Sequence, residues 1–224
     1  MKTAAPIRFL FFLMIALVLS ACAIRPSVID TTSLPARSGL QENVRQMLLV
    51  TDEPFLFFTS RKVYALEKHN SSWRQAMEPM NAVVGRNGFA KAGEKREGDG
   101  RTPSGLYRLG MAFGYAPSAA TKMPYRQALA DDLWVDDASA PDYNRWVKQN
   151  ETRALSYEKM KRDDDLYQYG MVIEYNTDPV VKGYGSAIFL HIWAGAKSST
   201  AGCVAVSEED ILKRLEFYSK NEDK

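Results

Sequence analysis

Histidine and cysteine are both scarce in this chain of 224 residues, which has two of each. Two cysteines support neither a scaffold of several disulfides nor a zinc site made of four thiolates. The histidines, His69 and His191, stand far apart in the sequence, and no His-x-x-x-His or Cys-x-x-Cys pair occurs. We therefore expect neither a metal site nor a cofactor, and few residues remain that could carry chemistry.

An excess of charge of one sign is missing as well. The chain has 29 basic and 27 acidic side chains, a formal net charge of +2. Nucleic-acid binding calls for a clustered basic excess, so we expect no nucleic-acid partner. The hydrophobic share of 46% and the charged share of 25% are typical of a globular protein, and the length suits a single domain.

The N-terminus has the pattern of an export signal. Lys2 and Arg8 precede an apolar run over residues 9–19, which is too short to span a bilayer comfortably. The following Leu19-Ser20-Ala21-Cys22 resembles the lipobox of bacterial lipoproteins. The resemblance implies a signal peptide over residues 1–21, with lipid carried by Cys22. The alternative is an ordinary signal peptide with an incidental cysteine.

These features predict a periplasmic domain anchored to a membrane through its N-terminal lipid. Ala23 follows the cysteine where Asp would favour the inner membrane, so we expect the outer membrane in a cell that has two. Loss of residues 1–21 removes Lys2 and Arg8, leaving 27 basic and 27 acidic side chains. Residues 22–39, rich in Ser, Thr and Pro, read as a tether, and residues 40–224 as the folded domain.

The first part of this domain has the pattern of strands. Short apolar runs over residues 47–51 and 55–59 flank Asp52-Glu53-Pro54, a turn signal. A second tight turn is predicted at Arg86-Asn87-Gly88. Residues 91–102 are charged and rich in glycine, and predict an exposed loop with solvated charges.

The second part mixes helix and strand patterns. Apolar spacing favours helices over residues 125–133 and 143–160, the latter capped by Asp142. Strands are predicted over residues 171–175 and 187–192, the second apolar on both faces except at His191. After these, Ser207 and Asp210 form a capping box. That signal predicts a C-terminal helix with Ile211, Leu212, Leu215 and Tyr218 on one side.

One segment combines a histidine at a strand end with a loop of small residues and a Gly202-Cys203 pair. If Cys22 carries lipid, Cys203 is a lone thiol, unable to form an internal disulfide and open to oxidation. A nucleophilic cysteine needs a base beside it, which His191 could supply. Backbone amides around Gly202 could hold an oxyanion. Their spacing in the sequence does not show whether Cys203 and His191 are in contact. A buried cysteine is also commonly unreactive, so an inert Cys203 is the alternative.

Several motifs here resemble the L,D-transpeptidase catalytic domain (the YkuD-type domain). His191 followed by Thr200-Ala201-Gly202-Cys203 resembles its signature of His, a variable loop and Ser/Thr-His-Gly-Cys. The stretch from Glu97 to Gly105 resembles its Asp-Gly-x-Thr-Pro-x-Gly stretch. Further likeness to a subgroup lies at Trp134–Asp137, Tyr143-Asn144 and Gly183–His191, so the resemblance runs from about Val83 to Leu215.

The resemblance implies a β-rich α+β fold, with a mixed-sheet, sandwich-like core and the active site in a groove between sheets. It implies that Cys203 is the nucleophile, that His191 is its base, and that the Ile192 carbonyl orients the imidazole. Amides at Gly202 and Cys203 would form the oxyanion hole. Thr200, Trp193 and Tyr184 are candidates for substrate contacts.

The reaction implied is attack on the third residue of a peptidoglycan stem peptide, with loss of a terminal D-amino acid. The resulting thioester is transferred to an amine, a step in the biogenesis of the cell wall that maintains cell shape. No sequence feature indicates a protein partner.

Two departures from the motif leave alternatives open. Ala201 stands where the family has its second histidine, and Ala205 where it has a polar residue. The first alternative is a hydrolase, a carboxypeptidase, endopeptidase or amidase acting on stem-peptide bonds. The second is a non-catalytic lipoprotein that binds the wall. Product masses separate transfer from hydrolysis, and slow alkylation of Cys203 would favour the binding protein.

Overall fold

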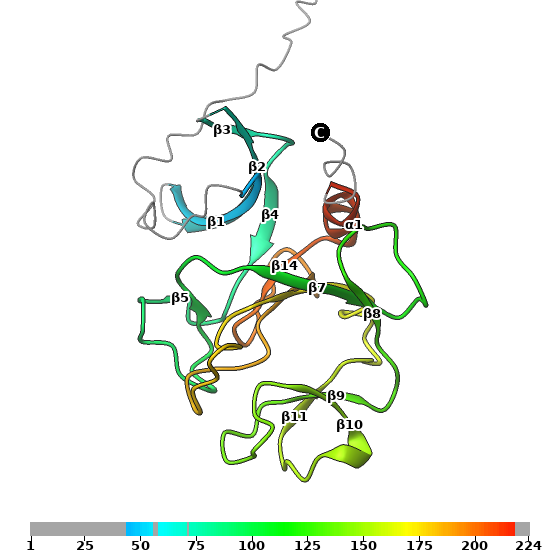
Figure 1. The fold of residues 1–224 in the computed structure, drawn as a ribbon. Helices are drawn as coiled ribbons and strands as arrows, with labels where there is room; N and C mark the ends of the chain where they lie inside the picture. Colours follow the sequence, from blue (N-terminus) through cyan, green and yellow to red (C-terminus); the bar gives the residue numbers. More distant parts are fainter. Residues whose placement is uncertain (1–43, 56–57, 71, 218–224) are drawn as a thin grey trace, which may run out of the picture.

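The computed structural model describes residues 44–55, 58–70 and 72–217 (Figure 1). The expected signal peptide (1–21), the tether (22–39) and Cys22 lie outside the described residues. Within the described ranges, no helix is long and apolar enough to cross a membrane.

Short strands dominate the described chain, which confirms the predicted β-rich α+β class. The strands are β1 (Gln46–Phe55), β2 (Phe58–His69), β3 (Ser72–Gln75), β4 (Met80–Val83), β5 (Phe89–Ala90), β6 (Thr102–Pro103), β7 (Leu109–Gly114), β8 (Tyr125–Gln127), β9 (Asp132–Val135), β10 (Trp146–Lys148), β11 (Tyr157–Lys159), β12 (Tyr169–Ile173), β13 (Phe189–Ile192) and β14 (Val204–Val206). A 3₁₀ turn, η1 (Gln149–Glu151), and one helix, α1 (Glu208–Phe217), complete the described elements.

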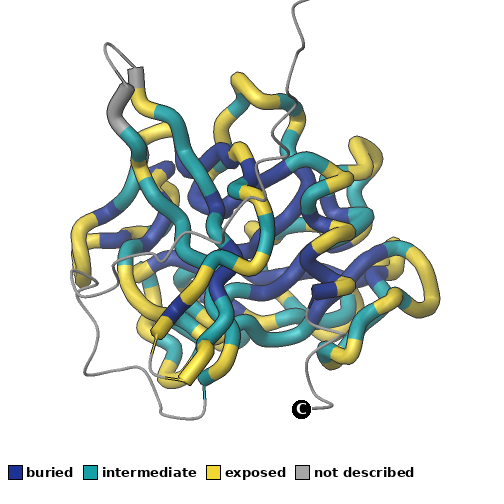
Figure 2. Tube along the Cα trace, turned by 90° about the horizontal axis from the view of Figure 1, so that it is seen from above, coloured by how far each residue is buried: buried dark blue, intermediate teal, exposed yellow. Residues whose placement is uncertain are grey.

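A nine-stranded mixed sheet is the centre of the fold. Its order is β1-β2-β4-β14-β13-β12-β7-β8, with β3 beside β2. The pairs β13/β14 and β7/β8 are parallel, and the other neighbours are antiparallel. A three-stranded sheet, β10-β9-β11, and the small pair β5-β6 are separate. Figure 2 shows the deepest burial along the central strands.

Alternation along these strands sends side chains to two cores, one on each face. One face carries Met171, Leu190 and Val204, which cluster with Ile211 and Leu215 of α1. The opposite face carries Phe113, Val172, Phe189 and Cys203, which cluster with Trp134 of the three-stranded sheet. In Figure 1, α1 and the three-stranded sheet accordingly lie on opposite sides of β7 and β14. Cys203 therefore faces the three-stranded sheet.

The C-terminal helix begins where its capping signal predicts. Ser207 Oγ accepts a hydrogen bond from Asp210 N (3.1 Å) and donates one to Asp210 Oδ2 (2.7 Å). Ile211 and Leu215 are buried, but Leu212 is 37% exposed and lies off the buried face. Tyr218 lies outside the described residues.

The two helices predicted over residues 125–133 and 143–160 are wrong. These stretches form β8 to β11 and η1, and Asp142 caps no helix. Their apolar side chains pack between sheets instead. Trp134 lies opposite Trp146 across β9 and β10, and the Trp146 ring packs edge to face against Phe113. Tertiary packing of aromatic side chains has overridden a weak helical period.

The predicted turn at Asp52-Glu53-Pro54 is also wrong, because these residues continue β1. Asp52 pairs with Arg61 of β2, and Arg61 Nε donates to Asp52 Oδ1 at 2.9 Å. Pro54 is tolerated because β1 lies at the edge of its sheet. The tight turn at 86–88 is confirmed by the hydrogen bond from Gly88 N to Gly85 O (2.8 Å).

Close packing across the central sheet gives one stability prediction. Gly170 of β12 lies beside Phe113, and an added Cβ would stand 2.2 Å from the Phe113 Cζ atom. We expect Gly170→Ala to lower the free energy of unfolding by about 2–3 kcal/mol, because the buried ring has no space into which to move. Urea denaturation measures the change.

Gly110→Ala is the matched control, since its Cβ would meet only the end of the Glu174 side chain at 2.9 Å. Its free energy of unfolding should stay within about 0.5 kcal/mol of the wild type. Equal effects of the two substitutions would contradict the packing argument.

Candidate active site

Two adjacent parallel strands bring His191 and Cys203 to the same face of the large sheet. His191 of β13 is in register with Ala205 of β14, and Cys203 immediately precedes β14. Backbone groups hold the sulfur: Phe189 N donates to Cys203 Sγ at 3.3 Å, and Sγ donates to Ala187 O at 3.2 Å. Both side chains are buried, with exposed fractions of 6% for His191 and 7% for Cys203.

The imidazole of His191 is oriented by a backbone carbonyl. Its Nδ1 lies 2.7 Å from Ile192 O, and a carbonyl only accepts, so Nδ1 carries the proton. In the neutral ring, Nε2 is then the nitrogen that can accept a proton. The Tyr167 ring packs against the imidazole edge to face, with ring centroids 5.0 Å apart.

Burial makes both groups neutral near pH 7. It lowers the pKa of His191 to about 4 and raises the pKa of Cys203 to about 12. The resting pair is therefore a thiol and a neutral imidazole rather than a thiolate and an imidazolium. Such an arrangement can support general-base activation, in which the imidazole removes the thiol proton as the sulfur attacks.

A cavity of about 370 Å³ opens beside this pair. Among the residues predicted from the sequence, it is lined by His191, Trp193, Thr200, Gly202 and Cys203. Across the cavity lie Asp136, which follows β9, and Glu158 of β11, so the cavity lies between the two sheets. The other predicted residues do not line this cavity. Ile192 borders a neighbouring cavity of about 420 Å³.

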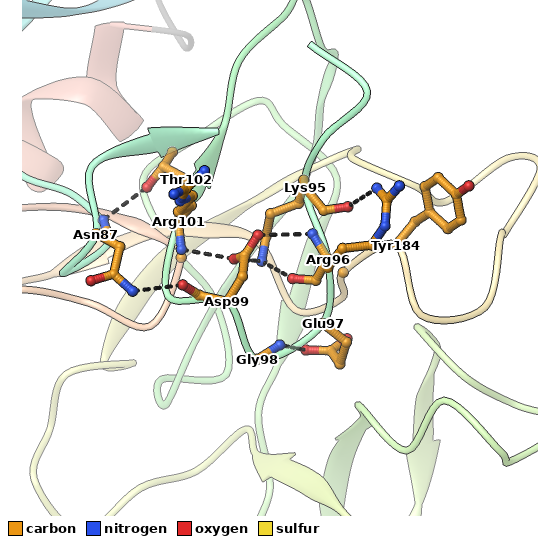
Figure 3. A network of polar contacts seen from close by, with 12 residues as sticks. Asn87, Lys95, Arg96, Glu97, Gly98, Asp99, Arg101, Thr102 and Tyr184 are labelled. Carbon is orange, nitrogen blue, oxygen red and sulfur yellow. Dashed lines mark hydrogen bonds and ion pairs between the residues drawn. The ribbon is translucent and has the colours of Figure 1, made fainter. Parts of the chain in front are cut away.

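Tyr184 is 40% exposed and lies outside this lining. The guanidinium of Arg96 stacks over its ring, 4.2 Å from the centroid (Figure 3). Tyr184 therefore contacts Arg96 of the charged loop over residues 91–102 and does not line the cavity beside Cys203.

The loop before Cys203 is closed by its own threonine. Gly202 N donates to Thr200 Oγ1 at 3.2 Å, and Thr200 Oγ1 donates to the Cys203 carbonyl at 2.7 Å. The Gly202 N–H would have to exchange this bond in order to hold an oxyanion. Ala205 is fully buried at the base of the same cavity, while Ala201 is exposed at its rim.

Charged residues also line the cavity wall, and none of them was among the site residues predicted from the sequence. Glu97, Asp136 and Glu158 line it together with Lys95 and Arg162. Burial raises the pKa values of Asp136 and Glu158. In the described ranges, no group of three or more His, Cys, Asp and Glu side chains is arranged to hold a metal ion.

Lys95 is an exception in the loop over residues 91–102, which was predicted to be exposed with solvated charges. It is only 3% exposed, and its Nζ donates to Asp99 Oδ1 at 2.6 Å. Glu97 is similarly engaged, because its Oε2 accepts a hydrogen bond from Ser186 Oγ at 2.6 Å. The Gly-rich motif is the sequence feature that could have predicted an ordered loop here, because a loop of solvated charges does not require several glycines.

The lowered pKa of His191 predicts a pH-dependent stability. Between about pH 6.5 and pH 4 the unfolded chain binds a proton at His191 that the folded chain does not, so stability falls as the pH falls through this window. We expect the loss to reach about 3 kcal/mol, from the size of the pKa shift. His191→Gln should lack this part of the pH dependence.

Urea denaturation of both proteins at pH 7, 5.5 and 4 measures the difference, because other titrating groups are common to the two. Parallel stability curves for wild type and His191→Gln would contradict burial of a neutral imidazole.

Comparison with known protein families identifies a match over most of the described chain. A family model described as the L,D-transpeptidase catalytic domain (YkuD) matches residues 58–220. No curated protein and no solved structure matches the chain.

Proposed function

Because the chain belongs to the family of L,D-transpeptidase catalytic domains, we propose that it is a peptidoglycan L,D-transpeptidase with Cys203 as nucleophile and His191 as base. The observation that carries the proposal is the placement of His191 on β13 and of Cys203 immediately before the adjoining β14, with both side chains lining one cavity. The Ile192 carbonyl, 2.7 Å from Nδ1, leaves Nε2 available as the proton acceptor.

The first half of the reaction forms a thioester. Cys203 Sγ releases its hydrogen bond to Ala187 O and gives its proton to His191 Nε2 while it attacks the carbonyl carbon of the third stem residue. The tetrahedral oxyanion collapses, the bond to the terminal D-amino acid breaks, and the imidazolium returns the proton to the leaving amine. Backbone N–H groups at Gly202 and Cys203 stabilise the oxyanion, the former after exchanging its bond to Thr200.

The second half regenerates the thiol. An acceptor amine loses a proton to His191 and attacks the thioester carbonyl, and the sulfur leaves as Cys203 recovers the proton. Water in place of the amine would give hydrolysis by the same atoms. Trp193 and Thr200 line the cavity and are the proposed substrate contacts among the predicted residues.

We also propose that the lipobox-like Leu19–Cys22 anchors this domain in a membrane, facing the periplasm. An attached lipid would hold the domain near the peptidoglycan that it modifies. Metabolic labelling with a clickable fatty acid tests the anchor, and Cys22→Ser should remove the label.

The test of the reaction uses the purified wild-type protein with disaccharide tetrapeptide muropeptides. Intact-protein mass spectrometry should show a thioester adduct, and the products should include cross-linked dimers. Shortened monomers without dimers would establish a hydrolase instead, and no adduct with no product would overturn both enzymatic functions. Slow alkylation of Cys203 no longer distinguishes a binding protein, because a buried thiol with a pKa of about 12 alkylates slowly in either case.

A further inference from the structure

We infer that Thr102 is a positioning residue that fixes the backbone of Cys203, and the inference deepens the proposed function. Thr102 is 3% exposed and lies 101 positions before Cys203 in the sequence. Its hydroxyl accepts a hydrogen bond from Gly85 N (2.9 Å) and donates one to the Cys203 carbonyl (3.2 Å). A hydroxyl has one proton to donate, and here the Cys203 carbonyl receives it.

The hydroxyl occupies a place in the sheet that a backbone hydrogen bond would otherwise fill. Strands β4 and β14 are antiparallel, with Val83 opposite Ala205 and Ala82 opposite Val206. The same register continued by two residues puts Gly85 opposite Cys203. At that position the Thr102 hydroxyl stands between the Gly85 N–H and the Cys203 carbonyl. The ladder is thus opened by one side chain at the residue that bears the thiol.

Two glycines make room for the segment that carries Thr102. An added Cβ at Gly85 would stand 2.4 Å from Gly100 O, and one at Gly202 would stand 3.1 Å from Arg101 O. The backbone of residues 100–101 therefore passes close to both the end of β4 and the loop that precedes Cys203. Residues 100–102 act as a wedge between the two, with the Thr102 hydroxyl at its inner end.

The wedge is held by the Asp99 side chain (Figure 3). Asp99 Oδ1 accepts from Lys95 Nζ (2.6 Å) and Arg101 N (2.8 Å), and Oδ2 accepts from Arg96 N (2.8 Å). Asn87 clamps the other side, donating from its backbone N to Gly100 O and from Nδ2 to Asp99 O. The ion pair between the buried Lys95 and the half-buried Asp99 therefore serves to present Thr102.

Thr200 also donates to the Cys203 carbonyl, at 2.7 Å, from three residues earlier in the same loop. The backbone of Thr200 is bonded to the end of β4, because Thr200 N donates to Val84 O (3.0 Å) and Arg86 N donates to Thr200 O (2.9 Å). Thr102 adds a tie from outside that loop, which links the Cys203 carbonyl both to Gly85 and to the wedge. The bond from Thr102 is thus the one through which the wedge positions Cys203.

The test compares Thr102→Val, which keeps the shape and removes the hydroxyl, with Thr102→Ser, which keeps the hydroxyl. Thr152→Val is the control: it removes a hydroxyl that accepts from Ala154 N at 3.0 Å and lies outside the cavity lining. With muropeptide donor, we expect kcat of Thr102→Val to fall at least about 10-fold with KM within about 3-fold, because a displaced nucleophile costs rate more than binding. Thr102→Ser and Thr152→Val should stay within about 3-fold of the wild-type kcat.

Alkylation of Cys203 by iodoacetamide gives a readout that needs no substrate. Thr102→Val should alkylate at least about 5-fold faster than wild type, since a loosened carbonyl lets the buried thiol reach solvent more often. This arm separates the two proposals: if the wild type forms no acyl-enzyme, the transpeptidase proposal fails while the alkylation ratio still tests Thr102.

If Thr102→Val does not fold, Thr102→Ala, which adds no bulk, replaces it. Wild-type kcat and wild-type alkylation in the folded hydroxyl-free variant would overturn the inference. So would an equal loss in Thr102→Ser, because the methyl group and not the hydroxyl would then be responsible.

Discussion

Cys203→Ala is expected to form no acyl-enzyme and to lose at least about 10³-fold of the transfer rate, because the substitution removes the atom that bonds to the substrate. Its fold should persist, with a loss of about 1–2 kcal/mol in the free energy of unfolding, since only one buried sulfur and its two backbone hydrogen bonds are lost. Intact-protein mass spectrometry after incubation with muropeptides measures the adduct.

Cys203→Ser sharpens this prediction. A serine hydroxyl at the same position keeps a donor toward Ala187 O but is a much weaker nucleophile than a thiol. We expect an ester adduct to form at least about 10³-fold more slowly than the thioester. A muropeptide adduct on Cys203→Ala at the wild-type rate would place the nucleophile elsewhere and overturn the mechanism.

His191→Gln should lower kcat by about 10²- to 10⁴-fold, the range that a general base contributes. Glutamine fills part of the ring's volume but does not take up the thiol proton. The pH dependence should change with it. The rate of acyl-enzyme formation by the wild type should be flat from about pH 5 to pH 9, because the imidazole, with a pKa of about 4, is already neutral there.

In His191→Gln, the rate should instead rise about tenfold per pH unit through this range, since a thiol with a pKa of about 12 forms more thiolate at each step. His69→Gln is the matched control, because His69 is an exposed side chain that lies 3.7 Å from Glu67 at the end of β2. A flat profile in His191→Gln, or an equal loss in His69→Gln, would contradict the assignment of His191 as the base.

Parts of the fold that depend on local signals could be predicted from the sequence. The β13 strand is buried on both faces, as its continuous apolar run predicts, and α1 begins at the Ser207 capping box. His191 and Cys203 were proposed as a catalytic pair on similar signals, because a histidine ends the buried strand and a glycine precedes the cysteine. The spacing left their relative placement open, and the parallel pairing of β13 with β14 puts both on the lining of one cavity.

Features that depend on distant segments could not be predicted. The cavity wall takes Glu97 from a loop, Asp136 from the end of β9 and Glu158 from β11, and no local pattern links the three. The helix predicted over residues 143–160 is wrong because its apolar spacing reflects contacts with another strand. Trp146 packs against Trp134 across β9 and β10 rather than along a helix face. Lys95 looked solvated because its burial depends on a segment far along the chain, where a Cβ added at Gly185 would stand 3.1 Å from the Lys95 Cε atom.

The placement of Cys203 within the aromatic cluster limits which residues of the cavity can change without loss of the fold. The thiol shares its packing with Phe113, Phe189 and Tyr167, so the floor of the cavity is also the core of the domain. Substitutions in this floor would lower the stability of the fold as well as the reactivity of the thiol. Residues of the rim, such as Ser198 and Ala201, border the cavity but are not part of the core. A related chain that binds a different substrate would therefore differ at the rim of the cavity while its floor stays the same.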